Sequence, residues 1–255
     1  GLRSAIPSEA VYLRDVVRSG DDAALQTLLN DETVFTIGAN AEMTIDEFVY
    51  DPAAADGTLV ANVQRGAFRF MSGKIASYQQ DQVLINSPSG YIGVRGTMLD
   101  IVVGDDAVAA ARASGMVSGD ALAGAGDDAT LVVLRGPGRQ QTGLNRDGGA
   151  YVNSGADEMT LWKSGTAAFM PRAGGQIFGP FRLEDGLFLA FASNIGSDAV
   201  STTTGVPPRD LRPALQDVLD FRDLRRPPAP GGPGNNSCPG QCPNNQEDGF
   251  RGDSQ

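Results

Sequence analysis

The chain of 255 residues is long enough to bury a hydrophobic core without metals or disulfide bonds, and it fits one large all-β domain or two small ones. Its net charge of −11 argues against binding to nucleic acid or to anionic lipid, because both carry charge of the same sign. The sequence contains no histidine, which removes the commonest general base and transition-metal ligand, so we expect a non-enzymatic protein without a cofactor.

The chain begins with Gly1 rather than methionine, which a processed precursor or a trimmed chain would explain equally well. No apolar run approaches the roughly 20 residues that a membrane-spanning helix requires. We therefore expect no membrane insertion, and we expect that a secretory signal has been removed.

Residues 1–104 contain short apolar runs separated by turn residues. Thr33–Ile37 alternates and stops at Gly38, and Met43–Tyr50 is followed by a turn at Asp51-Pro52. Strands with this spacing predict an all-β sandwich, barrel or short solenoid. Alternating aromatic side chains are predicted to fill core layers in pairs, and glycines at strand ends are predicted to adopt left-handed backbone. The aromatic residues are Phe48, Tyr50, Phe68 and Phe70, and the glycines are Gly38, Gly73, Gly93 and Gly96.

Residues 105–128 are rich in Ala, Gly and Asp, and we expect a surface insertion with at most a short helix within Ala107–Ala113. Residues 129–205 resume the strand pattern and are predicted to extend the same β domain. Within them, the run Leu187–Ala192 fits either a last strand or the start of a buried helix, because periodicity alone does not separate the two.

Residues 206–226 are predicted to form an amphipathic helix with Asp210 as its cap. Its apolar face is predicted to pack against the open end of this domain or against another subunit, because a single helix cannot bury such a face by itself. The residues of this face, at i, i+4, i+7 and i+8, are Leu211, Leu215, Val218 and Leu219.

Residues 227–255 form a Pro/Gly-rich tail that cannot build a packed core and is expected to be extended. Cys238 and Cys242 lie close together beside Pro and Gly, so a disulfide bond between them is sterically reasonable and fits an extracytoplasmic protein. Pairing with another chain, or a metal site completed by ligands from elsewhere, remains open.

Several motifs in residues 11–104 resemble the FecR domain family of extracytoplasmic bacterial proteins. In chain order they are Val17–Gly20, Ala24–Gly38, Ile45–Pro52, Gly66–Gly73 and Ser87–Thr97. The resemblance implies a compact, all-β, solenoid or roll-like domain without enzymatic activity. In the best-known members this domain is the periplasmic part of an anti-sigma regulator that responds to an outer-membrane transporter.

This sequence shows no membrane span and no sigma-binding helix bundle ahead of the domain. We therefore expect it to be similar to the secreted or surface-exposed relatives, extended here by further strands, one C-terminal amphipathic helix and the tail.

Oxygen-bearing side chains gather in one stretch that could hold calcium, although solvated turn acids are the favoured interpretation. They are Asn145, Asp147, Asn153, Asp157 and Glu158. The pairs Asp105-Asp106 and Asp127-Asp128 are interpreted in the same way.

Arg95, between two glycines, is expected either to be buried against a carboxylate or to be exposed. The tripeptide Arg251-Gly252-Asp253 is expected by chance in this composition.

Three functions follow as hypotheses. The first is a self-assembling structural protein, such as the subunit of an extracellular fibre or matrix, which associates through the C-terminal helix and tail. The alternative is a soluble envelope module for ligand binding or signalling, related to FecR regulators, with a concave aromatic patch drawn from Trp162, Tyr12, Tyr78 and Tyr151. The third, a hydrolase with paired carboxylates, has no positive signal in the sequence.

Overall fold

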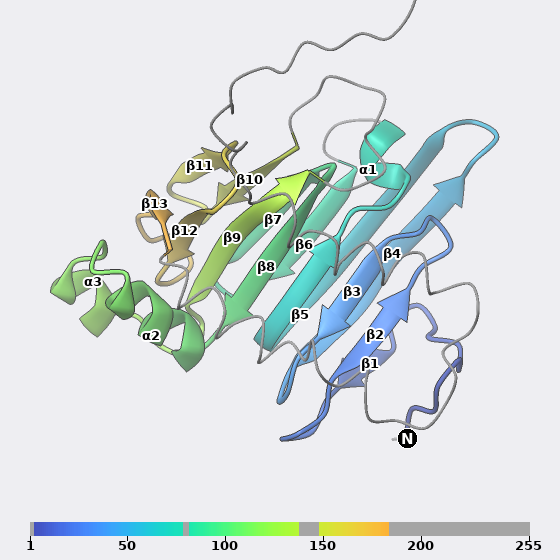
Figure 1. The fold of residues 1–255 in the computed structure, drawn as a ribbon, viewed down its shortest axis with the longest axis horizontal. Helices are drawn as coiled ribbons and strands as arrows, with labels where there is room; N and C mark the ends of the chain where they lie inside the picture. Colours follow the sequence, from blue (N-terminus) through green and yellow to red (C-terminus); the bar gives the residue numbers. More distant parts are fainter. Residues whose placement is uncertain (1–2, 79–81, 138–147, 184–255) are drawn as a thin grey trace, which may run out of the picture. The chain divides into compact units, whose positions relative to one another are not determined.

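The structure, a computed structural model, describes residues 3–78, 82–137 and 148–183 (Figure 1). These residues all belong to one structural unit. The apolar run Leu187–Ala192, the predicted helix over 206–226 with its apolar face, and the tail with Cys238 and Cys242 lie outside the described residues.

The described residues form thirteen strands and three short helices. The strands are β1 (Val16–Arg18), β2 (Leu25–Leu28), β3 (Val34–Ile37), β4 (Glu42–Asp51), β5 (Asp56–Met71), β6 (Val83–Ser87), β7 (Gly90–Arg95), β8 (Thr97–Val103), β9 (Thr130–Pro137), β10 (Gly149–Asn153), β11 (Glu158–Leu161), β12 (Thr166–Met170) and β13 (Phe178–Arg182). The helices are α1 (Ile75–Tyr78), α2 (Asp105–Ala113) and α3 (Gly119–Ala123). None of the described helices is long and apolar enough to cross a membrane.

Strand β5 organises the fold because it belongs to two sheets in succession. Its first half pairs with β4 and β6, and its second half pairs with β3 and β8. Sheet A therefore runs β1-β4-β5-β6-β7-β10-β11, and sheet B runs β2-β3-β5-β8-β9-β12-β13. The change of sheet falls at Gly66, whose φ of +90° strongly favours glycine.

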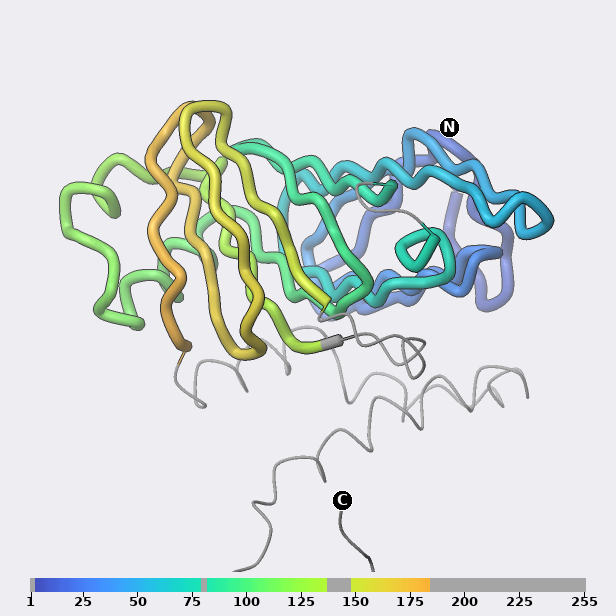
Figure 2. Tube along the Cα trace, turned by 90° about the horizontal axis from the view of Figure 1, so that it is seen from above, coloured from blue at the N-terminus to red at the C-terminus, as the bar shows by residue number. Residues whose placement is uncertain are grey.

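The main hydrophobic core lies between the two sheets, which form two facing layers (Figure 2). Alternate residues of each strand point inward, as the period of two requires. Phe68 and Phe70 of β5 are fully buried, and Phe70 makes an edge-to-face contact with Phe35 at 5.1 Å between ring centroids. Phe48 and Tyr50 pack against the same core while partly buried, so the predicted role of these aromatic pairs is confirmed.

A second cluster covers the outer face of sheet B with α2 and α3. The short helix expected within Ala107–Ala113 begins two residues earlier, at Asp105. Its small residues Ala107, Ala110 and Ala111 are buried against outward-facing side chains of β8, β9 and β12. Residues 105–128 are therefore more than a surface excursion, because they remove one face of sheet B from water.

The mostly-β class is confirmed, but the expected solenoid is wrong. Only the β5–β6 ladder is parallel among the described strands, and every other ladder is antiparallel. A β-solenoid stacks successive coils in parallel register, whereas this chain turns back through short hairpins such as β6–β7. The result is two sheets folded over a shared core.

A buried carboxylate connects the turn before β3 to the turn after β5. Asp31 and Thr33 are both 0% exposed. The Asp31 carboxylate accepts hydrogen bonds from Thr33 N at 3.0 Å, Thr33 Oγ1 at 2.7 Å and Ile75 N at 3.3 Å. The Asp31 carbonyl accepts another from Lys74 N at 2.7 Å. The Asp31 side chain therefore connects the segment Ala24–Gly38 to the residues that follow directly after Gly73.

The same close approach explains Gly73. A Cβ atom there would lie 2.3 Å from the Asp31 carbonyl oxygen, so glycine is needed for space and not for left-handed backbone. Gly96 does have a positive φ, of +54°, as predicted. Gly93 lies within β7 instead of at its end, so that prediction is wrong.

We predict that Asp31→Asn destabilises the domain by about 1.5–3 kcal/mol, because the new amide group would face hydrogen-bond donors at a fully buried site. Urea unfolding followed by circular dichroism measures this change. Asp51→Asn is the matched control, since Asp51 also accepts two backbone N–H bonds but in an exposed turn. Equal losses of stability in the two variants would contradict the anchoring role of Asp31.

Candidate functional site

The outer face of sheet A carries a row of polar side chains that are direct cross-strand neighbours. Its members come from β4, β5, β6, β7, β10 and β11, and we call them the amide row. They are Thr44, Asn62, Asn86, Tyr91, Asn153 and Glu158. No described helix packs on this face, in contrast to the outer face of sheet B.

Hydrogen bonds along the amide row fix the orientation of its side chains. Asn62 Nδ2 donates to Asp46 Oδ2 at 2.5 Å and to Thr44 Oγ1 at 3.4 Å. Asn86 Nδ2 in turn donates to Asn62 Oδ1 at 2.9 Å. The hydrogen bond from Asn86 to Asn62 therefore orients both amides, so the donors and acceptors of these two side chains are ordered.

Three aromatic side chains follow β10 on the same face, and we call them the aromatic column. Tyr151 belongs to β10 itself, and Tyr91 lies opposite Asn153 with its ring centroid 6.1 Å from that of Tyr151. Trp162 is 54% exposed and lies over Gly149, where a Cβ atom would come within 2.8 Å of the indole. The absence of a side chain at Gly149 thus lets the indole rest on the strand.

Arg95 lies beside the aromatic column, because it is the cross-strand neighbour of Gly149. Its guanidinium carbon is 5.7 Å from the centroid of the Trp162 ring, within the range of a cation–π interaction. Arg95 is half-buried, and its guanidinium lies over an aromatic ring.

The Tyr151 hydroxyl is held at the crossing of the row and the column. It donates a short hydrogen bond to Glu158 and accepts one from Asn153 Nδ2 at 3.1 Å. The hydrogen bond to the Glu158 carboxylate raises the pKa of Tyr151 above its ordinary value.

Of the four aromatic residues predicted to form a patch, the structure brings together Trp162 and Tyr151 only. Tyr78 stacks on Tyr50 at 6.3 Å with an interplanar angle of 6°, beside α1. These two residues lie on the outer face of sheet A.

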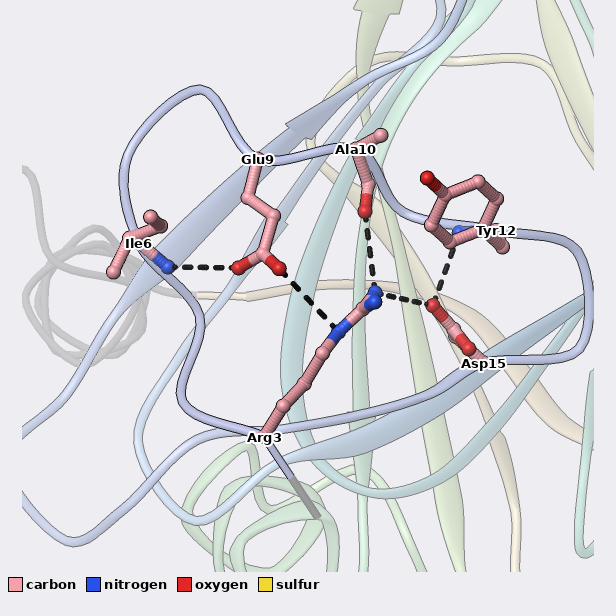
Figure 3. Close-up of polar contacts among 6 residues, drawn as sticks. All are labelled: Arg3, Ile6, Glu9, Ala10, Tyr12 and Asp15. Carbon is pink, nitrogen blue, oxygen red and sulfur yellow. Dashed lines mark hydrogen bonds and ion pairs between the residues drawn. The ribbon is translucent and has the colours of Figure 1, made fainter. Parts of the chain in front are cut away.

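Tyr12 belongs to a separate cluster in the N-terminal segment (Figure 3). The Arg3 guanidinium lies 5.4 Å from the centre of the Tyr12 ring, 2.7 Å from Asp15 Oδ2 and 3.6 Å from Glu9 Oε1. Arg3 also donates to the Ala10 carbonyl at 3.2 Å. These contacts close the segment on itself, so Tyr12 has a structural partner there.

The described members of the oxygen-bearing group considered for calcium mostly accept hydrogen bonds from backbone N–H groups in turns. Asp157 accepts hydrogen bonds from Ile177 N at 2.8 Å and Glu158 N at 2.9 Å, and Asn153 accepts one from Gly155 N at 2.7 Å. Asn145 and Asp147 lie outside the described residues. Within the described ranges, no group of three or more acidic or cysteine side chains is arranged to hold a metal ion.

A buried ion triad spans β5, β8 and β9. Asp100 Oδ1 is 2.8 Å from Arg69 Nε, and Asp100 Oδ2 is 3.1 Å from Arg135 Nε. The Asp100 side chain is 2% exposed, and the two arginines are 12% and 9% exposed. Because both oxygens are engaged, we assign this carboxylate to holding three strands of sheet B together.

We predict that Asp100→Asn destabilises the domain by about 3–5 kcal/mol, since it removes the carboxylate charge that faces two buried guanidinium groups. Glu42→Gln is the matched control, because Glu42 also bridges two arginines, Arg18 at 3.0 Å and Arg65 at 3.3 Å, at the surface. The control should lose much less stability, as water screens surface ion pairs. Similar urea midpoints for the two variants would contradict the assignment.

We predict that Glu158→Gln lowers the pKa of Tyr151, because it removes the carboxylate that favours the protonated phenol. NMR titration of tyrosine ring carbons measures the change directly. Glu47→Gln, on β4 of the same sheet, should leave the Tyr151 titration where it is. An unchanged titration in the Glu158 variant would show that this hydrogen bond does not form in solution.

The sequence did not lead us to predict Tyr91, Asn62 and Asn86 as members of a site. The signal for Tyr91, Asn62 and Asn86 was present, since each alternates with buried aliphatic residues and therefore faces outward. Their assembly into one row depends on the parallel register that pairs Asn62 with Asn86, and no local pattern encodes that register.

The fold is similar to two crystal structures of a "putative anti-sigma factor" from Parabacteroides distasonis ATCC 8503, at 2.50 Å and 1.65 Å resolution. The first has a TM-score of 0.40 and a sequence identity of 13%, and the alignment covers 65% of this chain and 59% of the other protein. The second has a TM-score of 0.39 and a sequence identity of 12%, and the alignment covers 64% of this chain and 58% of the other protein.

This chain thus matches about three fifths of the length of each of those proteins. No protein-family model and no curated protein matches it. Nothing about binding or activity follows from a similarity of this size. The resemblance of residues 11–104 to FecR domains therefore rests on its motifs.

Proposed function

We propose that the described domain is a non-enzymatic recognition module that works outside the cytoplasm and binds its partner through the outer face of sheet A. The observation that carries this proposal is the meeting of the amide row and the aromatic column on one face. A row of oriented amides beside an exposed indole offers both hydrogen-bonding groups and a stacking surface.

The difference between the two outer faces supports this proposal. The helices α2 and α3 cover β8, β9 and β12 on the outer face of sheet B, whereas Trp162 at 54% and Tyr91 at 37% remain exposed on sheet A. Large aromatic residues left exposed together are common at recognition surfaces, where their burial supplies binding energy. The extracytoplasmic location and the absence of catalysis are supported by the FecR-like motifs and by the lack of histidine.

The self-assembly hypothesis depends on the predicted helix over 206–226 and the tail over 227–255, which lie outside the described residues. Nothing in the described part of the chain favours it. We therefore place recognition first among the functions considered.

Photo-crosslinking tests the proposal even while the partner is unidentified. We predict that a benzoylphenylalanine at Thr160, the cross-strand neighbour of Tyr151, forms an adduct of higher mass in the cells that make this protein. The same group at Leu28, which is 50% exposed on sheet B, is the control and should form none.

Three outcomes would overturn the proposal. They are equal adducts from both positions, no adduct from Thr160, and an adduct of twice the chain's mass, which would indicate contact between copies. Fractionation of the same cells tests the location, since recovery in the cytoplasm would contradict it.

A further inference from the structure

We propose that the outer face of sheet A binds a neutral polysaccharide, which stacks on the aromatic column and hydrogen-bonds to the amide row. This inference rests on the proposed function and names the class of its ligand. Sugar rings combine an apolar C–H face with a rim of hydroxyl groups. A complementary surface therefore needs aromatic rings and polar side chains side by side.

The charge of the face argues for a neutral ligand. Its central outward positions are uncharged. Charged side chains flank them: Asp46 accepts a hydrogen bond from Asn62, Glu47 lies opposite Val60, Glu158 accepts a hydrogen bond from Tyr151, and Arg95 lies over Trp162. A further charged group, Arg18, Glu42 and Arg65, lies at the start of β4. The central residues are Val60, Asn62, Leu84, Asn86, Tyr91, Gly93, Tyr151, Asn153 and Thr160. In a chain with a net charge of −11, an uncharged centre of this extent would neither attract a polycation nor tolerate a polyanion.

The indole of Trp162 is placed to stack on a sugar. Gly149 leaves room for the ring to rest on the strand beneath it, and the indole is still 54% exposed. Arg95 supports the ring from the neighbouring strand, at 5.7 Å from its centroid. An aromatic ring supported by the strand loses little conformational freedom when a ligand covers it.

The length of the column indicates a chain of sugars instead of a single unit. Trp162 lies over Gly149, Tyr151 is two residues further along β10, and Tyr91 is opposite Asn153. Four residues of extended strand span about 13 Å. That length exceeds one sugar ring, so adjacent units of an oligosaccharide would contact successive aromatic side chains.

The amide row supplies hydrogen-bonding groups for the hydroxyl rim. Asn86 uses its Nδ2 to donate to Asn62, and no hydrogen bond from a described residue ends on its Oδ1. An amide both donates and accepts, as a hydroxyl group does, so the two classes are complementary.

The chain contains a single tryptophan, so Trp162 reports directly on this face. We predict that titration of the full chain with cellohexaose, xylohexaose or isomaltohexaose shifts or quenches its fluorescence in a saturable way for at least one sugar. Native gels containing hydroxyethyl cellulose, xylan or dextran should retard the protein correspondingly, and alginate should not.

Trp162→Ala should weaken the retardation at least tenfold, and Trp162→Phe should restore part of it. Tyr12→Ala is the matched control, because Tyr12 is equally exposed at 62% but belongs to the N-terminal cluster. It should bind as the unchanged protein does. Circular dichroism confirms that each variant is folded.

Three results would overturn the proposal: no response to any neutral sugar, retardation by alginate that salt abolishes, or equal losses in the Trp162 and Tyr12 variants. If Thr160 crosslinks to a protein while every neutral sugar fails, the polysaccharide is wrong and the recognition function stands. If both the crosslink and the sugars fail, the recognition function fails as well.

Discussion

The whole fold depends on a single strand that hydrogen-bonds within two sheets in turn. β5 pairs with β4 and β6 as far as Arg65, and with β3 and β8 from Gly66 onward. This continuity keeps the two sheets in a fixed relation, because each is paired to its own half of the same strand and a shift of either along β5 would break its pairs. Gly66 makes the turn between them with a φ that other residues rarely adopt.

The two sheets use their outer faces in different ways. On the outer face of sheet B, α2 covers β8, β9 and β12, and its alanines allow close approach, while the triad around Asp100 holds β5, β8 and β9 together. Sheet A leaves Trp162 and the amide row exposed. One face therefore contributes burial to stability, and the other remains available for a partner, which is why the proposed function is assigned to sheet A.

Local pattern explains the parts of the fold that the sequence predicted. Alternation in β5 placed Phe68 and Phe70 in the core, and the alanine-rich run after Gly104 predicted the short helix now called α2. These features depend on residues close together in the chain, so their periodicity is visible without a structure. The solenoid was wrong because strand direction is set by how strands pair, and the motifs do not encode pairing.

The sequence by itself determined the mostly-β class, the acidic surface and the lack of any histidine-based chemistry. It also placed Trp162 and Tyr151 among the candidate aromatic residues. Only the tertiary structure decided that these two share a face with Asn62, Asn86 and Tyr91, while Tyr12 and Tyr78 do not. The physical reason is register, because side chains from distant strands become neighbours only through a specific set of backbone hydrogen bonds.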